Sequence, residues 1–326
     1  MSFNVLFTSA GRRVSLIRNF RAALDGLGLA GKLVTADLQT NAPAPFVADQ
    51  RELVPRVSDP AYIDTLLEIC RRHDIKLVVP LIDTELPILA PHREDFARAG
   101  VTLLVSSTDV NRICFDKRQT ARFFRSIGVD TPAIIDPASI LSGADARYPY
   151  LLKPAAGSSS VGVTKINDAR ELAFFLEYVS DPIVQEFIRG EEYTLDILVD
   201  FAGKVRSVVP RLRIETRAGE VSKGLTVKNR AIIEAGRRVA ESLPGALGCV
   251  TVQCFLTPEG RIVFIEINPR FGGGFPLAAA AGADFPRWII EMMLGRYCER
   301  PIDAWQDDLA MLRYDEGIFV EGSLIR

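Results

Sequence analysis

The sequence predicts a parallel α/β domain in its first third, followed by an α+β region made mainly of antiparallel strands. Two observations indicate this fold class. In the first hundred residues short apolar strands alternate with helical patterns, as in a parallel sheet covered by helices. Further on, strand follows strand, and the apolar runs at 250–256 and 262–268 are separated only by the turn sequence TPEGR. That spacing indicates an antiparallel hairpin.

The N-terminal third is predicted to contain four strands and two helices. Strands are expected at 4–9, 32–37, 76–83 and 101–107, and helices at 13–27 and 62–72. Ligands of parallel sheets collect at the carboxyl ends of the strands. The loop at 8–13 and the side chains of Asp83 and Glu85 are therefore pocket candidates, although solvated loop carboxylates are the simpler interpretation of the last two.

The loop at 8–13 reads TSAGRR and contains a single glycine. It departs from GxGxxG, so it gives poor support for a dinucleotide site. A plain turn with Ser9 near the helix cap is one interpretation. Arg12 and Arg13 favour another, because the helix dipole disfavours cations at a helix start and a bound anion would explain them.

The rest of the chain changes pattern near Asp116, where a helix carrying Lys117 is expected to begin. A small α+β unit follows, and then a mostly antiparallel region with one long helix. In the small unit we expect strands at 148–154 and 182–188, a further strand that ends at Ile166, and a helix at 169–178. In the antiparallel region we expect strands at 191–200 and 204–214 and a helix at 227–243.

The composition is that of an ordinary globular protein, with 48% hydrophobic and 25% charged residues among 326. A net charge of −2 gives no general attraction to nucleic acid or to an anionic membrane. The five cysteines are scattered without a CxxC pair, which indicates neither a disulfide framework nor a zinc site. With no signal peptide or membrane span evident, a reducing cytoplasm and small-molecule ligands are expected.

The predicted C-terminal hairpin carries a set of polar side chains. Glu266 and Asn268 are two residues apart and share a face of their strand, and Gln253 on the partner strand can point with them. Their oxygens suit Mg²⁺, which completes its octahedron with waters and substrate phosphate. Arg270 can grip a phosphoryl oxygen with its forked guanidinium, and Gly272–Gly274 leave backbone N–H groups bare for an anion. A solvated hairpin explains each residue alone, but not the set.

A loop rich in glycine and serine lies between two predicted strands and comprises Gly157, Ser158, Ser159, Ser160 and Gly162. Its backbone and hydroxyls could wrap phosphate oxygens, although it is not a Walker A loop and a simple turn would look the same. Lys153 lies in the apolar strand that feeds the loop. A buried ammonium is costly and seeks an anion, whereas Lys117 on a helix could be merely solvated.

Together these residues resemble the ATP-grasp superfamily, particularly the synthetase domains of the carbamoyl phosphate synthetase large subunit and the pyrrolysine-pathway ligase. The order of motifs is similar along nearly the whole chain: a sheet domain, Asp116–Lys117, LLKP, GSSSVGV, QEFIRGEEYTLD, Gln253 and EINPR. The resemblance implies an N-terminal pre-ATP-grasp domain followed by a two-lobed ATP-grasp domain. The expected boundaries are 1–108 for the first, 109–188 for the small lobe and 189–326 for the large lobe.

The resemblance also implies ATP as a ligand and assigns residues to it. Lys117 and Lys153 would hold its phosphates beneath the loop at 157–162. Glu192 would bind the ribose hydroxyls, although Glu186 and Glu192 could equally be the wet face of their strands. The expected hinge strand against adenine comprises Gln185, Glu186, Phe187 and Ile188.

The metal set and the catalytic residues follow from the same resemblance. Gln253, Glu266 and Asn268 would hold one or two Mg²⁺, with Mn²⁺ as a substitute, and Arg270 would steady the transferring phosphoryl group beside Lys153. Many similar proteins have an acidic residue at the position of Gln253, and a neutral ligand would hold a second metal more loosely.

The implied activity is that of an ATP-dependent ligase, which joins a small carboxylate to an amine through an acyl phosphate. One module of this size cannot be carbamoyl phosphate synthetase, and the chain has no biotin attachment motif. A kinase of a small acid, a non-catalytic nucleotide-binding module and a nicotinamide-dependent oxidoreductase are the alternatives. No nucleic-acid or membrane partner is expected, and a homodimer would be common among proteins of this kind.

A basic segment precedes the proposed metal strands. It contains four cations that could bind phosphate or a carboxylate substrate, although a solvated loop explains them about as well. They are Arg211, Arg213, Lys223 and Lys228.

Overall fold

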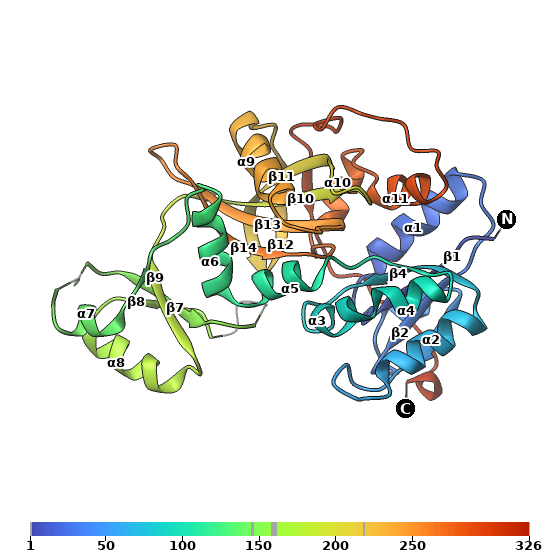
Figure 1. Cartoon of the computed structure of the whole chain (residues 1–326), viewed down its shortest axis with the longest axis horizontal. Coiled ribbons are helices and arrows are strands. Elements are labelled where there is room, and N and C mark those ends of the chain that lie inside the picture. Colours follow the sequence, from blue (N-terminus) through green and yellow to red (C-terminus); the bar gives the residue numbers. More distant parts are fainter. Residues whose placement is uncertain (1, 145–146, 158–161, 218, 326) are drawn as a thin grey trace.

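Three β-sheets follow one another along the molecule in the computed structural model (Figure 1). The structure describes residues 2–144, 147–157, 162–217 and 219–325. A five-stranded sheet near the N-terminus and a four-stranded sheet at the opposite end flank a six-stranded sheet. The predicted combination of a parallel α/β part and an antiparallel α+β part is confirmed.

The five-stranded sheet is parallel and has the order β3-β2-β1-β4-β5. The edge strand β3 was not predicted, because its sequence QREL lacks an apolar pattern. Helices α3 and α4, between β4 and β5, were not predicted either. The elements are β1 (Asn4–Thr8), α1 (Val14–Gly26), β2 (Leu33–Asp37), β3 (Gln50–Leu53), α2 (Tyr62–Arg72), β4 (Ile75–Pro80), α3 (Leu86–Leu89), α4 (Arg93–Arg98) and β5 (Thr102–Leu103).

Alternation along β1 divides its side chains between two hydrophobic cores. Val5 and Phe7 belong to the core that contains the buried face of α1. Leu6 points the other way, into a core with Leu66 of α2 and Phe96 of α4. Because helices cover both faces, Val5, Leu6 and Phe7 are all apolar, as successive residues of parallel strands usually are.

The four-stranded sheet is antiparallel, with the order β6-β9-β7-β8. Its own small core includes Leu152, Val184 and Leu172. The elements are β6 (Ile134–Ile135), α7 (Pro137–Leu141), β7 (Tyr150–Pro154), β8 (Thr164–Ile166), α8 (Ala169–Tyr178) and β9 (Pro182–Glu186).

The six-stranded sheet has the order β14-β13-β10-β11-β12-β15, and all of its neighbouring strands are antiparallel. Strand β12 was not predicted as a strand. It forms a hairpin with β11, so three of the four cations of the basic segment, Arg211, Arg213 and Lys223, lie in strands and not in a loop. The elements are β10 (Glu191–Val199), β11 (Val205–Arg217), β12 (Glu220–Thr226), α9 (Arg230–Glu241), β13 (Gly248–Leu256), β14 (Ile262–Asn268) and β15 (Ala310–Leu312).

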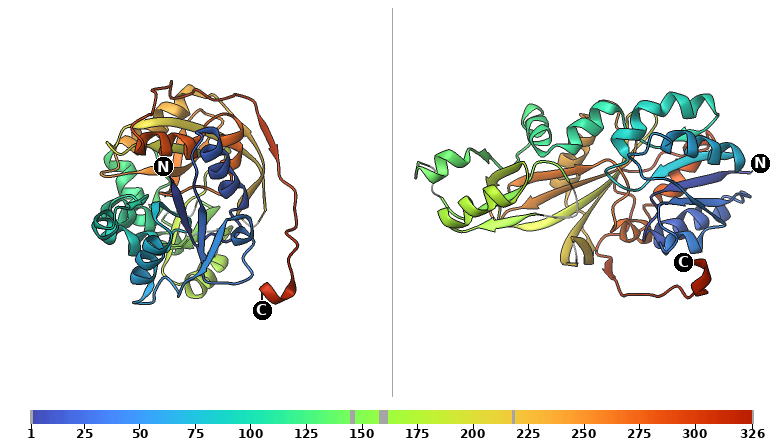
Figure 2. Two further views of the ribbon diagram at one scale, coloured as in Figure 1. Left: turned by 90° about the vertical axis from the view of Figure 1, so that its right-hand side faces the viewer. Right: turned by 90° about the horizontal axis from the view of Figure 1, so that it is seen from below.

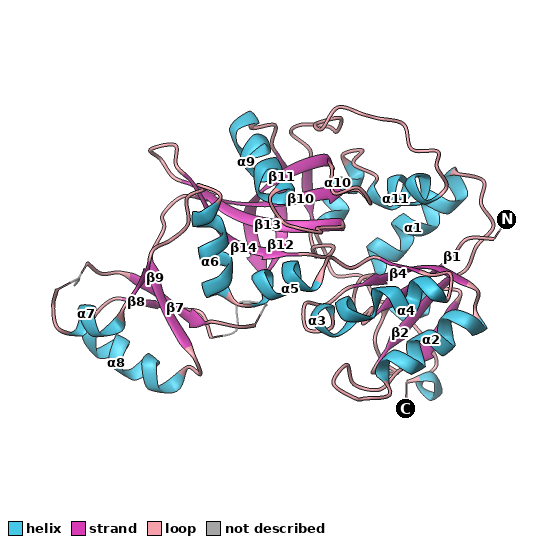
Figure 3. Cartoon of the chain, in the orientation of Figure 1, coloured by secondary structure: helices cyan, strands magenta, loops and turns pink. Residues whose placement is uncertain are grey.

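Two helices lie beside the edge strand β14 of the large sheet, α5 (Thr108–Phe115) and α6 (Lys117–Ser126) (Figure 3). The Asp116 side chain caps α6 by accepting a hydrogen bond from the backbone N–H of Arg118. Phe124 of α6 packs on Phe264 of β14, with ring centroids 5.5 Å apart. Lys117, the first residue of α6, is thereby held near the carboxyl end of β14.

The N-terminal sheet and the large sheet share one hydrophobic core. Helix α1 contacts α10 (Phe275–Ala280) and α11 (Phe285–Met293). Phe20 of α1 joins the two sides, since its ring lies 5.0 Å from that of Phe7 and 6.0 Å from that of Phe271. This packing brings the loop after β1 close to the segment that follows β14.

The chain end returns along the outside of the molecule to the N-terminal sheet (Figure 2). Thr40 donates a hydrogen bond to the carbonyl of Ile325 (3.2 Å), and Arg18 lies 3.4 Å from Glu316. In the part of the chain that the structure describes, no helix has the length and apolar character needed to cross a bilayer.

Candidate active site

The predicted hairpin of β13 and β14 brings its polar side chains together. Gln253 pairs with Glu266 and Thr251 with Asn268 across the two strands. The Gln253 amide donates a hydrogen bond from Nε2 to Oε2 of Glu266 (3.0 Å). Glu266, Asn268 and Gln253 line one cleft, as the alternation of side chains along strands requires.

The oxygen of Gln253 is occupied by Arg213 of β11. Arg213 donates from Nη1 to Gln253 Oε1 (2.8 Å) and lies 2.9 Å from Glu192 of β10. The amide therefore presents its nitrogen, and not its oxygen, to Glu266. For a cation to bind to both Glu266 and Gln253, Arg213 would have to release the amide oxygen. A cation bound by Glu266 and Asn268 alone requires no such change.

Two lysines enter the cleft from other elements. Lys153 of β7 is buried, and burial lowers its pKa to about 8; nearby Glu266 opposes this shift and Lys117 adds to it. Lys117 donates from Nζ to the carbonyl of Gly157 (2.8 Å). Burial also lowers the pKa of Lys117, against the opposing effect of Glu266. Two ammonium groups held near one carboxylate favour a further anion between them.

The glycine-rich loop is described only at its two ends. Gly157 and Gly162 both have positive φ values, 109° and 73°, which glycine adopts readily. A Cβ at Gly162 would lie 3.1 Å from the ring of Pro154. Ser158, Ser159 and Ser160 lie outside the described residues, so their predicted contacts with phosphate stay predictions.

These residues line a cleft of about 500 Å³ between the four-stranded and six-stranded sheets. It brings together most of the residues that the sequence singled out. The sequence-predicted residues in its lining are Arg13, Lys117, Lys153, Gly157, Glu192, Arg211, Arg213, Gln253, Glu266, Asn268, Arg270 and Gly272–Gly274.

Glu192 lines this cleft at its ion pair with Arg213. Burial raises the pKa of the Glu192 carboxyl, with a contribution from Glu266, although Arg213 counteracts both. The carboxylate is therefore neither free nor fully solvated, and its predicted contact with ribose stays a prediction.

The predicted hinge residues do not line the same cleft. Glu186, Phe187 and Ile188 line a separate cavity of about 650 Å³, and Lys165 lies 5.1 Å from the ring centroid of Phe187. Gln185 is buried in β9, and its Oε1 has no hydrogen-bond partner among the described residues. Their role in binding adenine stays a prediction. The unpaired oxygen of Gln185 is a hydrogen-bond acceptor that would be available to adenine.

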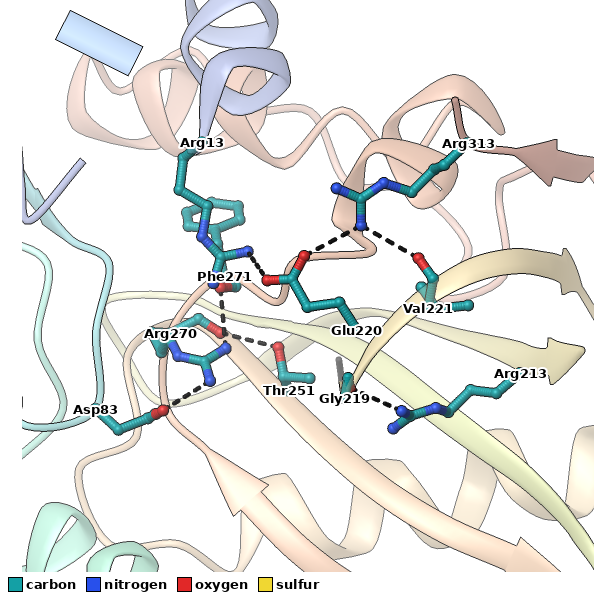
Figure 4. Close-up of polar contacts among 10 residues, drawn as sticks. All are labelled: Arg13, Asp83, Arg213, Gly219, Glu220, Val221, Thr251, Arg270, Phe271 and Arg313. Atoms are coloured by element: carbon teal, nitrogen blue, oxygen red, sulfur yellow. Dashed lines mark hydrogen bonds and ion pairs between the residues drawn. The ribbon is translucent and has the colours of Figure 1, made fainter. Parts of the chain in front are cut away.

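Arg270 reaches across to the N-terminal domain (Figure 4). It donates from Nη2 to Oδ2 of Asp83 (2.7 Å) and from Nη1 to the carbonyl of Phe271 (3.1 Å). Burial acts to lower the pKa of Arg270, but Asp83 and Glu266 act in the other direction and the pKa is raised, so the guanidinium stays charged.

The interpretation of Asp83 and Glu85 as solvated loop carboxylates is wrong. Asp83 is largely buried against Arg270. Glu85 is fully buried and accepts hydrogen bonds from the backbone of Leu81, from Ser9 and from Tyr62. Glu85 thereby fixes the loops at the carboxyl ends of β1 and β4, which position Asp83.

Sequence reasoning missed the pairing of the arginines in this region. Arg213 and Arg211 were noticed only as members of a basic segment, and the signal that was available is their spacing of two along β11, which puts them on one face. Of the other two cations, Lys223 pairs with exposed Glu215 (2.7 Å) and Lys228 lies over Trp305. Both are outside the cleft.

The fold and the cleft define a two-lobed α+β protein joined to a parallel-sheet domain. Residues 5–104 match the family model described as PylC-like, N-terminal domain, and residues 114–274 match the ATP-grasp domain. The chain belongs to the ATP-grasp superfamily.

Two curated relatives illustrate the similarity. The vancomycin/teicoplanin A-type resistance protein VanA of Enterococcus faecium is 29% identical over 227 residues, which cover 61% of this chain and 66% of VanA. The 3-methyl-D-ornithine--L-lysine ligase of Methanosarcina acetivorans is 28% identical over 264 residues, 80% of this chain and 66% of that protein. The matched region thus spans just under two thirds of the length of either relative.

Solved structures show the same fold at low sequence identity. The biotin carboxylase domain of the Hydrogenobacter thermophilus 2-oxoglutarate carboxylase, in complex with MgADP, ADP and bicarbonate, has a TM-score of 0.75 and 16% identity, covering 95% of this chain and 74% of that one. An L-amino acid ligase from Bacillus licheniformis has a TM-score of 0.68 and 19% identity, covering 89% and 73%.

Proposed function

We propose that the protein is an ATP-dependent ligase that joins a small carboxylic acid to an amine. The observation that carries this proposal is the cleft in which Lys153 and Lys117 face Glu266, with Asn268 and Arg270 beside it. The similarity to ligases supports the proposed bond formation, since several curated relatives are named as D-alanine--D-alanine ligases. A module that only bound nucleotide would have no need of this full set of side chains.

The residues present suit ATP and a divalent cation. Lys117, Lys153 and the backbone near Gly157 offer cationic and N–H groups to phosphate oxygens. Glu266 and Asn268 would hold Mg²⁺, and Mn²⁺ in its place, with oxygen ligands of the kind both ions accept. No group of three His, Cys, Asp or Glu side chains is placed to hold a metal ion within the described ranges. The bound cation would neutralise charge on the phosphates.

In the proposed reaction an oxygen of the acid attacks the γ-phosphorus of ATP, and the bond from that phosphorus to the bridging oxygen of ADP breaks. The products of this step are an acyl phosphate and ADP. The amine nitrogen then attacks the acyl carbon, phosphate leaves, and the nitrogen gives up a proton. The protein's part is alignment and stabilisation of charge. Arg270, held by Asp83, would stabilise negative charge on the phosphoryl group as it moves.

The proposal is tested by screening pairs of small acids and amines for release of ADP and phosphate, with the product identified by its mass. We expect release to depend on Mg²⁺ and on both substrates. Release that persists undiminished without any amine, with a phosphorylated acid as the product, would identify a kinase. Substrate-stimulated nicotinamide reduction in place of ADP release would identify an oxidoreductase.

Variants at the cleft sharpen this test. Glu266→Ala and Arg270→Ala are expected to lower kcat by about a hundredfold or more, because one preorganised electrostatic contact contributes roughly 3 to 4 kcal/mol to the barrier. Glu241→Ala removes an exposed carboxylate from the end of α9, outside the cleft, and serves as the control. Full activity in both cleft variants would refute the site.

A further inference from the structure

Several arginines gather where the cleft meets the loop after β1, and Figure 4 shows all of them but Arg211. They come from four separate parts of the chain: the start of α1, strand β11, the segment after β14 and the segment after β15. Directly beside them lie the successive glycines Gly272–Gly274, since a Cβ added at Gly273 or Gly274 would meet Arg13 or Arg211. We call this group the arginine cluster; its members are Arg13, Arg211, Arg270 and Arg313.

Arg211 has one guanidinium nitrogen without a partner. The side chain is 1% exposed and binds Asp196 through Nε (2.6 Å) and Nη2 (3.2 Å). Its Nη1 is buried and has no hydrogen-bond partner among the described residues. This nitrogen lies beside Gly274, where an added Cβ would be 2.3 Å away. A buried donor of this kind costs free energy unless something accepts from it, and Arg211 lines the cleft.

Arg13 is held at the junction of two cavities. It lies 3.8 Å from Glu220, which Arg313 also contacts at 3.2 Å. Both Arg13 and Glu220 line the main cleft and a second cavity of about 210 Å³ that is formed with residues of the loop after β1. Burial and the nearby Arg270 lower the pKa of Arg13 to about 10. Glu220 and Asp83 oppose this shift but do not cancel it, so this cation is poorly compensated.

The charges of the cluster do not balance. Its four guanidinium groups pair with three carboxylates, Asp83, Asp196 and Glu220. Glu266 also acts on Arg270, but it is shared with Lys117 and Lys153. Exposed Arg12 adds a further positive charge at the rim of the second cavity. At least one anionic group is therefore needed to balance the charge. The N-terminus of α1 disfavours the nearby cations Arg12 and Arg13, and it would favour the same anion.

We propose that this part of the cleft binds a free carboxylate of a substrate, one that takes no part in bond formation. Arg13 and Nη1 of Arg211 would donate to it, and Gly272–Gly274 line the same part of the cleft. The proposal rests on the ligase function proposed above and narrows its substrates to a class. The second cavity has the volume of about seven water molecules, so its occupant is a small acid and not a polymer.

The carboxylate can come from either partner of the reaction. It is the second carboxylate of a dicarboxylic acid whose other carboxylate is phosphorylated, or the carboxylate of an amino acid that supplies the amine. In both cases the group bound at Arg13 stays chemically unchanged. The same side chains would recognise the carboxylate from either source. The source is identified by finding which substrate, the acid or the amine, is no longer turned over when its extra carboxylate is removed.

The test compares matched substrates in the ADP-release assay. On the acid side succinate is compared with butyrate, and glutarate with pentanoate, each with a set of amines. On the amine side glycine and alanine are compared with their amides, each with a set of acids. We expect turnover to require the extra carboxylate on one side only. Equal kcat/KM for both members of every active pair would overturn the proposal.

Variants tie the effect to the cluster. Arg13→Gln is expected to raise KM for the carboxylate-bearing substrate by about tenfold or more, since a hydrogen bond to a charged group is lost, with KM for ATP nearly unchanged. With the substrate that lacks the carboxylate, Arg13→Gln should cause no further loss. Arg18→Gln, which removes an exposed cation from the same helix, is the control. Equal losses for both substrates would contradict binding at Arg13.

Direct binding separates this inference from the ligase proposal. Calorimetry without ATP should show that wild-type protein binds the dicarboxylate or amino acid chosen by the assay, and that Arg13→Gln binds it at least about tenfold more weakly. Should no pair release ADP, succinate and glycine serve as the probes. Binding of such a probe with Arg13 dependence would uphold the subsite while the ligase function fails, and absence of any such binding would overturn the subsite.

Discussion

Arg270 and Asp83 form a hydrogen-bonded ion pair of 2.7 Å between residues 187 positions apart in the chain. Arg270 follows β14 of the large sheet, and Asp83 follows β4 of the N-terminal sheet. The pair is mostly shielded from solvent, with side-chain exposures of 13% and 18%. The N-terminal domain therefore positions a guanidinium of the proposed active site, in addition to packing against the large sheet.

We predict that Asp83→Asn lowers both stability and turnover. The neutral amide would leave Arg270 without its charged acceptor, at a cost of about 1.5–3 kcal/mol in the free energy of unfolding. It would also lower kcat by roughly tenfold with little change in KM for ATP, because a poorly held donor stabilises the transition state less. Urea unfolding and steady-state kinetics measure the two effects.

Asp74→Asn is the control for Asp83→Asn. Asp74 forms an exposed contact with Lys76, and exposed pairs contribute about 0–1 kcal/mol. An Asp83→Asn protein that unfolds and turns over like Asp74→Asn would show that Arg270 does not depend on Asp83.

Lys153→Met should stabilise the free protein while it weakens binding of ATP. Because burial lowers the pKa of Lys153 from its usual 10.5 to about 8, the folded state carries the cost of a buried charge at pH 7. Removing the charge should raise the free energy of unfolding by on the order of 2 kcal/mol. Affinity for ATP should fall by about tenfold or more, since a charged donor to phosphate is lost.

The pH dependence of this effect has a defined sign. The penalty is complete below pH 8 and disappears as the pH rises from about 8 towards 10.5, where Lys153 is neutral in both states. The stability gained by Lys153→Met should shrink over that range, and the affinity of wild-type protein for ATP should fall. Lys153→Arg stays charged, so a similar fall in that variant would assign it to another group.

Gln253→Glu is predicted to lower the Mg²⁺ concentration needed for half-maximal activity. A carboxylate at this position would give the cation a second charged ligand beside Glu266, and Arg213 could still pair with its other oxygen. We expect a shift of a few fold to about tenfold in a metal titration of ADP release. An unchanged Mg²⁺ requirement would show that this position is not a ligand and that Gln253 only holds Arg213.

Gly274→Ala should destabilise the protein by about 1–3 kcal/mol, the usual cost of overpacking. Its Cβ would lie 2.3 Å from Nη1 of Arg211, and Asp196 prevents Arg211 from moving aside. Gly26→Ala, at the end of α1, would place its Cβ no closer than 3.8 Å to another atom outside the helix and should cost nothing. Equal urea midpoints for the two variants would contradict this packing.

Much of the fold was predictable because the pattern of apolar residues is strong. Helices α2 and α8 end at the predicted residues, 62–72 and 169–178. Strands β3 and β12 were missed for a physical reason. Strand β3, with the sequence QREL, is mostly exposed and has no apolar pattern. Strand β12, with the sequence EVSKGLT, contains charged residues and a glycine, and it forms a strand because it pairs with β11 on one side and β15 on the other.

The candidate site was predictable where it depends on local geometry. The spacing of Glu266 and Asn268 along one strand places both in the cleft, and Lys153 in an apolar strand indicated a buried ammonium. The pairs Arg270–Asp83 and Arg13–Glu220 depend on how the N-terminal domain packs on the large sheet. No local pattern encodes that contact, so neither pair could be read from the sequence.

Calorimetric titration of ATP into the purified protein, with Mg²⁺ and with EDTA, tests the central claim most directly. A cleft with ammonium groups on one side and Glu266 and Asn268 on the other should bind a single ATP per chain only when Mg²⁺ is present, and Glu266→Ala should remove that dependence. The account would be contradicted by wild-type protein that takes up no ATP, or that binds it equally well with EDTA.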